Sequence, residues 1–281
     1  MKKNVNVSFQ NEKTVKIRKE INMTQIISFI SAKGGVGKST LIYETFCRLI
    51  QDKRVLVIDM DYQATITRAL GQLTEKNTII DSLVNDGDLT PLEVIPDKLD
   101  LVPGYLLAED LEVQAINQEL ALDRLQEKIS NLLSEKEKQY DYILIDTPSA
   151  FLYLTSIAAI ACDQIVIPTA LNTTALADIK LIRNKLNLLY MRSMIPAEQF
   201  PKFKVIENLY NEDSAYDQRL DAQLATELES KQIPLLQVKR TCRFRQVLQN
   251  YQLAQENLQK VKKETKEERF LRNSLADFVK A

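Results

Sequence analysis

The sequence predicts an α/β protein built on one mostly parallel, twisted sheet with helices on both faces. Short apolar runs, which are typical of buried strands, alternate along the chain with stretches of helical periodicity. Glycine and proline are scarce, at 6 and 8 of 281 residues, and no linker, repeat or low-complexity segment divides the chain. We therefore expect a single domain over residues 23–281, preceded by a flexible, lysine-rich arm over residues 1–22.

Composition narrows the class of protein. With 45% hydrophobic and 27% charged residues, the chain can bury one α/β core. The weakly polar run from Phe151 to Cys162 is too short to span a bilayer, and the N-terminus has no apolar stretch of the signal-peptide kind, so we expect a cytoplasmic protein. Cys47, Cys162 and Cys242 form no C-x-x-C pair, which predicts packing roles rather than a disulfide, zinc or iron–sulfur site. Histidine is absent, which leaves carboxylates, lysines and bound metal for any chemistry.

The first expected elements are a buried strand over residues 25–31 and a helix over residues 41–50. The segment that joins them, residues 31–40, reads Ser-Ala-Lys-Gly-Gly-Val-Gly-Lys-Ser-Thr and predicts a phosphate-binding loop. In a loop of the form G-x-x-x-x-G-K-[ST], backbone N–H groups cradle phosphates, the lysine reaches the β and γ oxygens, and the hydroxyl binds Mg²⁺. The sequence therefore predicts a nucleotide site at the end of the first strand.

The match to this pattern is close but not complete. Gly37, Lys38 and Ser39 fill its last three positions, while Ala32 stands where the first glycine would be. The following helix adds its N-terminal dipole and free N–H groups, so we expect Ser39 and Thr40 in the first turn, facing the phosphates. A bare glycine turn would not need lysines on both sides of the Gly-Gly-Val-Gly run.

Later apolar runs predict the remaining strands, at residues 54–59, 99–102, 142–146, 164–168, 203–208 and 233–238. Ligand groups gather at the carboxyl ends of parallel strands, so the acids there are the candidates for chemistry. An apolar run that ends in Asp is the Walker B arrangement, in which the carboxylate holds Mg²⁺, usually through water. We assign that role to Asp146, although the pattern taken alone is more often a strand end or a helix cap.

Two motifs resemble those of the ParA/MinD group of P-loop ATPases. Residues 33–39 match K-G-G-x-G-K-[ST], the deviant phosphate loop of that group, and residues 59–63 resemble its D-x-D-P-Q motif, with Tyr62 in place of proline. The resemblance covers nearly the whole chain from residue 24. It includes residues 78–83 with 99–104, residues 161–168 after the Walker B strand, and residues 205–208, which resemble a strand ending in Asn.

The resemblance implies a site for ATP and Mg²⁺. Its catalytic residues would be Lys33, Lys38 and Asp61, with Asp61 positioning the attacking water. Its magnesium shell would involve Ser39, Asp59 and Asp146. Asn208 would read adenine, because a side-chain amide can pair a donor and an acceptor of the base, although a plain turn residue at the strand end explains Asn208 equally well. The nucleotide-binding residues would be Lys33, Gly34, Gly35, Val36, Gly37, Lys38, Ser39, Thr40 and Asn208.

Lys33 is the extra lysine of the loop. In the family this lysine crosses a two-fold interface to the phosphates of the partner's nucleotide, so the resemblance implies a homodimer that forms on ATP binding. A second cation contributes most where the γ-phosphate concentrates charge in a desolvated interface. Hydrolysis would be slow and would release the dimer. If Tyr62 disables the site, the chain would instead be a structural module without hydrolysis.

The leading functional hypothesis is DNA segregation. The resemblance implies that the ATP dimer binds nonspecific DNA on the nucleoid, and that a ParB-like centromere-binding partner stimulates hydrolysis. The net charge is −1, so DNA contact needs a local basic patch. The stronger of two basic runs lies just after the last predicted strand, where a solvated strand end would explain it equally well. That run contains Lys239, Arg240, Arg243 and Arg245, and a second, less specific run contains Lys180, Arg183, Lys185 and Arg192.

The alternative hypothesis is a MinD-like ATPase that cycles on a membrane. It would need a basic amphipathic helix at the C-terminus. Asp277 interrupts the apolar face there, and a closing helix packed on the sheet needs the same pattern, so we do not expect membrane contact. The apolar residues concerned are Phe270, Leu271, Leu275, Phe278 and Val279. An iron–sulfur carrier or a nitrogenase-reductase-like protein would need paired cysteines, which the sequence lacks.

Overall fold

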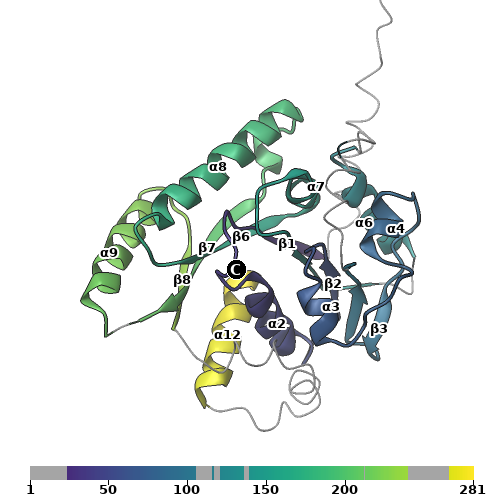
Figure 1. The fold of residues 1–281 in the computed structure, drawn as a ribbon, viewed down its shortest axis with the longest axis horizontal. Coiled ribbons are helices and arrows are strands. Elements are labelled where there is room, and N and C mark those ends of the chain that lie inside the picture. The colour runs from purple at the N-terminus through teal and green to yellow at the C-terminus, as the bar shows by residue number, and fades with distance from the viewer. Residues whose placement is uncertain (1–23, 106–115, 117–120, 136–138, 212, 240–265) are drawn as a thin grey trace, which may run out of the picture.

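The computed structural model describes residues 24–105, 116, 121–135, 139–211, 213–239 and 266–281. Its centre is an eight-stranded sheet with the strand order β3-β4-β2-β5-β1-β6-β7-β8 (Figure 1). The strands are β1 (Gln25–Phe29), β2 (Val55–Asp59), β3 (Leu92–Ile95), β4 (Leu99–Val102), β5 (Tyr142–Asp146), β6 (Gln164–Ala170), β7 (Lys202–Tyr210) and β8 (Leu235–Lys239). Every pair of neighbouring strands is parallel except β3 with β4. The predicted fold class is confirmed.

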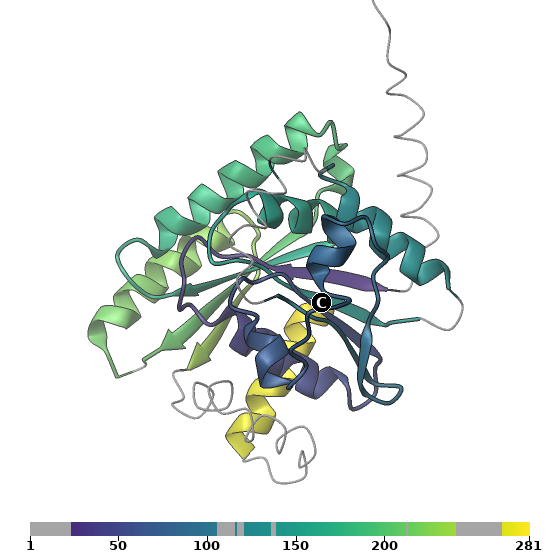
Figure 2. The same cartoon turned by 45° about the vertical axis from the view of Figure 1, so that its right-hand side comes forward.

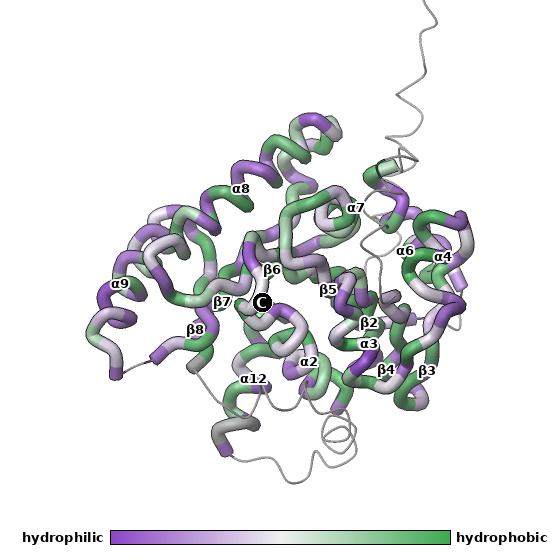
Figure 3. Tube along the Cα trace, in the orientation of Figure 1, coloured by the Kyte–Doolittle hydropathy of each residue, from purple (hydrophilic) through white to green (hydrophobic). Residues whose placement is uncertain are grey.

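Helices cover both faces of the sheet, as Figure 2 shows. One face carries α2 (Lys38–Leu49), α3 (Thr65–Ala69) and α12 (Lys266–Lys280), whose apolar residues share one core cluster. The other face has its own cluster, formed with α4 (Ile79–Leu83), α6 (Arg124–Ser134), α7 (Tyr153–Ala161), α8 (Ala175–Arg192) and α9 (Ala215–Glu229). Hydrophobic and hydrophilic residues alternate along α8 in Figure 3, as expected of a helix that buries one face.

The antiparallel edge strand β3 was not predicted. Its residues are half-buried or exposed, because the strand pairs on one side alone and lies at the end of the sheet. A run without fully buried residues gives a weak strand signal. A short turn that contains Asp97, with φ of 60°, joins β3 to β4.

The C-terminal helix α12 packs on α2, the helix that follows the phosphate loop. Leu275 and Val279 are fully buried between α12 and the sheet. Arg272 Nε donates to Glu44 Oε2 at 2.6 Å, and both side chains are buried. This confirms that the apolar face of the C-terminal helix closes the core. Phe270, which the sequence placed near the same face, is 74% exposed.

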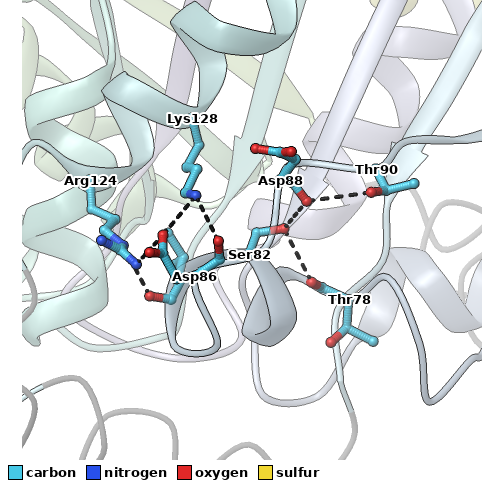
Figure 4. Close-up of polar contacts among 8 residues, drawn as sticks. Thr78, Ser82, Asp86, Asp88, Thr90, Arg124 and Lys128 are labelled. Atoms are coloured by element: carbon cyan, nitrogen blue, oxygen red, sulfur yellow. Dashed lines mark hydrogen bonds and ion pairs between the residues drawn. The ribbon is translucent and has the colours of Figure 1, made fainter.

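A polar cluster fastens the turn between α4 and β3 to helix α6 (Figure 4). Asp86 Oδ1 accepts hydrogen bonds from Arg124 Nη2 at 2.7 Å and from Lys128 Nζ at 3.0 Å. Ser82 Oγ, in the last turn of α4, donates to the carbonyl oxygen of Asp88 at 3.0 Å. The surrounding opposite charges hold the pKa of Asp86 below its ordinary value, with the Lys128 hydrogen bond as the main cause. This cluster fixes the start of the β3 edge.

Several sequence predictions fall outside the described residues: the arm over residues 1–22, Cys242, and Arg240, Arg243 and Arg245. Cys47 and Cys162 are buried, as expected of packing residues. Among the helices of the described part of the chain, none is long and apolar enough to cross a membrane.

Candidate nucleotide site

The phosphate loop leaves the carboxyl end of β1, in the middle of the sheet, and leads directly into α2. Gly35 and Gly37 have φ of 76° and 92°, a left-handed conformation that favours glycine. Helix α2 begins at Lys38, three residues before the predicted start, because the Leu41 N–H already bonds the carbonyl of Gly37 at 2.9 Å. Ser39 and Thr40 therefore lie in the first helical turn, as the motif predicts.

Lys38 lies inside the loop, with 5% of its surface exposed. Its Nζ donates to Ser31 Oγ and to Ser149 Oγ, each at 2.9 Å. Burial lowers the pKa of Lys38, and the nearby carboxylates of Asp146 and Asp61 act in the opposite direction. A cation held by two neutral hydroxyls can transfer to a stronger acceptor, such as a phosphate oxygen.

Asp146 lies at the end of β5, next to the helix that starts at the loop. Its Oδ2 accepts a hydrogen bond from Ser39 Oγ at 2.6 Å. Its Oδ1 is buried, and no donor among the described residues reaches it. Burial raises the pKa of Asp146 well above its ordinary value; Asp59 adds to the shift and Lys38 opposes it. An oxygen without a partner beside a serine hydroxyl fits one side of a Mg²⁺ shell, because Mg²⁺ prefers a few carboxylates and hydroxyls together with phosphates and water.

Asp59 lies beside Asp146 in the sheet, since the register of β2 and β5 pairs the two residues. Its carboxylate holds the chain that follows: Oδ2 accepts from Thr67 N at 2.9 Å and from Thr67 Oγ1 at 2.7 Å, and Oδ1 accepts from Asp61 N at 3.2 Å. Burial raises the pKa of Asp59 to about 6, and the bonds from Thr67 oppose that rise. Asp59 thus anchors the segment that carries Asp61, and its part in a magnesium shell stays a prediction.

Asp61 is 8% exposed, and its Oδ1 accepts from Gln63 N at 3.1 Å. Its negative charge raises the pKa of both Lys38 and Asp146, so it lies close to the loop. Tyr62, the departure from the family motif, is half-buried and packs against the core cluster. The structure therefore brings Asp61 to the end of the sheet where Lys38 and Asp146 lie.

Lys33 is placed differently from the other loop lysine. Its side chain is 49% exposed and reaches the start of helix α8, where Nζ lies 2.8 Å from Asp178 Oδ2 and 2.6 Å from Thr174 Oγ1. Thr174 Oγ1 in turn lies 3.0 Å from Asp178 Oδ2. Sequence reasoning did not find Thr174 or Asp178, since polar residues at a helix start are ordinary capping residues. Ser149 was also missed; its signal was its position three residues beyond Asp146.

Asn208 lies near the end of β7, in contact with the loop. Its side-chain Nδ2 donates to the carbonyl oxygen of Val36 at 2.8 Å, and 6% of the residue is exposed. A Cβ atom added to Gly37 would lie 2.2 Å from Asn208 Nδ2. The predicted strand-end Asn thus meets the predicted loop. A role in reading adenine stays a prediction.

The basic runs are less well defined. Lys239 is the last residue of β8, and the remainder of its run lies outside the described residues. In the second run, on α8, Lys180 pairs with Glu227 at 3.2 Å, and the Lys185 ammonium lies 5.4 Å from the centre of the Phe151 ring. These two side chains of α8 have partners within the chain.

The fold and the site define a P-loop nucleotide-binding protein: a glycine loop between β1 and α2, a buried lysine, and a serine bonded to an acid that ends a neighbouring strand. A family model described as "AAA domain" matches residues 24–196, more than half of the chain, so the chain belongs to that family. The relatives and solved structures that it resembles are of the ParA/MinD type, which confirms the family resemblance of its motifs.

One relative is the sporulation initiation inhibitor protein Soj of Bacillus subtilis. It is 31% identical over 174 residues, which are 59% of this chain and 66% of Soj. The match therefore spans slightly less than two thirds of that relative's length.

Two solved structures share the fold. A plasmid partition protein from Borrelia burgdorferi bound to AMPPNP has a TM-score of 0.68 and 22% identity, and the match covers 92% of this chain and 99% of that one. The septum site-determining protein MinD from Pyrococcus horikoshii complexed with Mg-ADP has a TM-score of 0.66 and 24% identity, with 92% and 96% covered. At these identities the likeness concerns the fold.

Proposed function

We propose that this chain is a slow ATPase that acts as a dimerising switch in DNA segregation. The observation that carries the proposal is the contrast between two lysines of one loop. Lys38 is buried where the phosphates of a nucleotide bound to the same chain would lie. Lys33 is half exposed and points out of the loop to the carboxylate of Asp178. One lysine is enough to bind a nucleotide in cis. A second lysine that points out of the loop is suited to the phosphates of a nucleotide bound to another copy of the chain.

The loop residues would bind the phosphates of ATP through backbone N–H groups and through Lys38, which would leave Ser31 and Ser149 for the β and γ oxygens. Ser39 and Asp146 would hold Mg²⁺, which when bound neutralises part of the phosphate charge. Asp61 would orient the attacking water, a role that requires position rather than strong basicity.

Dimer formation would require Lys33 to exchange Asp178 for the partner's phosphates. The pair of Lys33 and Asp178 is partly exposed, and such pairs are worth about 0–1 kcal/mol, so the exchange costs little. A two-fold dimer has two equivalent sites, each completed by the other chain's Lys33. The functional output of the switch would then be the time that the dimer persists before hydrolysis, which is why turnover would be slow.

The setting of this switch rests on the relatives. By analogy with partition proteins, the ATP dimer would bind nonspecific DNA in the cytoplasm, on the nucleoid, and a ParB-like centromere-binding protein would stimulate hydrolysis. The run from Lys239 to Arg245 remains the proposed DNA contact. The proposed organisation is a single ATPase domain over residues 23–281 with an arm over residues 1–22.

Cosedimentation with random duplex DNA and with anionic liposomes tests this function, in ATP, in ADP and without nucleotide. We expect the protein to pellet with DNA in ATP, and not in ADP. Lys38→Ala is the control and should pellet in no condition. Retention on liposomes in ATP would favour the membrane-cycling alternative, although Leu275 and Val279 of the helix that it would need are buried in the core in this structure. DNA binding that is equal with and without ATP would contradict the switch.

A further inference from the structure

The contact between Asn208 and the phosphate loop bears on how the loop is held. Asn208 lies on β7, and Val36 and Gly37 lie in the loop 172 residues earlier in the chain. The side-chain amide donates to the Val36 carbonyl oxygen at 2.8 Å, in a buried position. This bond ties the turn of the loop to the end of a strand two places away from β1 in the sheet.

The bond determines the orientation of one peptide group. In a trans peptide unit the C=O and the following N–H point in opposite directions. Because the Val36 carbonyl points to Asn208, the Gly37 N–H points away from Asn208. Backbone N–H groups at this end of a phosphate loop bind the phosphate oxygens. A free peptide group could rotate and turn its carbonyl oxygen, which repels phosphate, toward the ligand.

The space around Gly37 leads to the same conclusion. Gly37 has φ of 92°, and a Cβ there would lie 2.2 Å from Asn208 Nδ2. Asn208 therefore packs directly against the Gly37 backbone, as well as bonding the preceding carbonyl. The loop is held between the start of α2 and this side chain.

We propose that Asn208 is a positioning residue of the phosphate loop, which fixes the Val36–Gly37 peptide so that its N–H is presented to phosphate. This inference rests on the proposed nucleotide binding and refines it. In this role Asn208 affects the binding of the phosphate chain, whatever base is attached. In adenine reading it would affect the binding of the base. The two roles predict different losses when the amide is removed.

The experiment measures displacement of a fluorescent ATP analogue by ATP, by GTP and by inorganic tripolyphosphate, which has no base. The variants are Asn208→Ala and Asn208→Leu; the second keeps the branched shape of the side chain and removes the donor. Positioning predicts that all three competitors weaken by the same factor, about tenfold for one lost hydrogen bond in a buried site. The ratio of ATP to GTP affinity should not change.

Glu207→Gln is the matched control, one residue away on the same buried strand. Burial raises the pKa of Glu207 to about 8, which favours its neutral form, and glutamine has the same shape without a charge. This variant should displace the analogue as the wild type does. Thermal unfolding of each variant shows whether the fold is kept.

Four outcomes separate the hypotheses. Equal losses for ATP, GTP and tripolyphosphate in a folded variant support positioning. A loss for ATP alone, with tripolyphosphate unchanged and the preference for ATP over GTP reduced, would overturn it in favour of adenine reading, and unchanged affinity for all three would overturn it as well. If the wild type binds none of the competitors, the proposed nucleotide function itself fails.

Discussion

The two ends of the phosphate loop are built in opposite ways. At the inner end, Lys38 is buried and bonded to two hydroxyls, close to the carboxylates of Asp61 and Asp146. At the outer end, Lys33 is half exposed, and its charge is paired with Asp178 at the start of another helix. Burial holds Lys38 in one position, whereas the partly exposed Lys33 can change its ion-pair partner at little cost in free energy. The same residue type thus occupies two different environments within one motif.

The largest expected effect separates the two lysines in nucleotide binding. Lys38→Ala should weaken ATP binding to the monomer by at least about 100-fold, since it removes charge-assisted hydrogen bonds to phosphate in a buried place. Lys33→Gln should leave the same affinity within about twofold, because a half-exposed lysine outside the pocket contributes little in cis. Isothermal titration of each variant with ATP measures both values. Equal losses would show that the two lysines contribute alike to nucleotide binding.

Hydrolysis should depend on the inner end of the loop and its acids. Asp61→Ala should reduce ATP hydrolysis by on the order of 100-fold, because the attacking water loses its orienting carboxylate. ATP binding should remain, so the variant should accumulate as a dimer. A phosphate-release assay with saturating ATP measures the rate. Wild-type turnover in Asp61→Ala would show that another group orients the water.

The smallest expected effect concerns the resting partner of Lys33. Asp178→Asn removes the carboxylate that competes with a second chain's phosphates, so it should lower the dimer dissociation constant in ATP by about two- to fivefold, the range of one surface ion pair. Glu227→Gln is the control, because it removes an acid that pairs with Lys180 of the same helix. Light scattering across a concentration series gives both constants. A weaker dimer in Asp178→Asn would mean that Asp178 positions Lys33 for its task instead of restraining it.

Local pattern was sufficient to predict the core of the fold and the centre of the site. The strands that carry the site are buried on both faces, so their apolar runs are continuous and their positions could be predicted to within a few residues. The loop and the acid at the end of β5 follow from spacing within one strand and turn. The edge strand β3 lacked such a run, because it pairs on one side and buries little.

Contacts between distant segments could not be predicted. Lys38 meets Ser149 across 111 residues, Lys33 meets Thr174 across 141, and Asn208 meets Val36 across 172. Ser149 follows β5, Thr174 precedes α8 and Asn208 lies on β7, so each contact joins the loop to a different part of the fold. A single sequence shows which polar residues end those elements, but the pairing of their side chains depends on how the elements pack. For that reason the contacts of Ser149, Asp178 and the Asn208 amide were found in the structure and not in the sequence.

Sedimentation velocity of Asp61→Ala in saturating ATP, with and without Lys33→Gln, tests whether Lys33 links two chains. Asp61→Ala should slow turnover enough to keep the bound nucleotide as ATP during the run. Our account predicts a dimer for Asp61→Ala in ATP, a monomer in ADP, and a monomer for the double variant in ATP even though it still binds the nucleotide. A double variant that dimerises as readily as Asp61→Ala would contradict the account, because Lys33 would then be a surface charge and not the link between two chains.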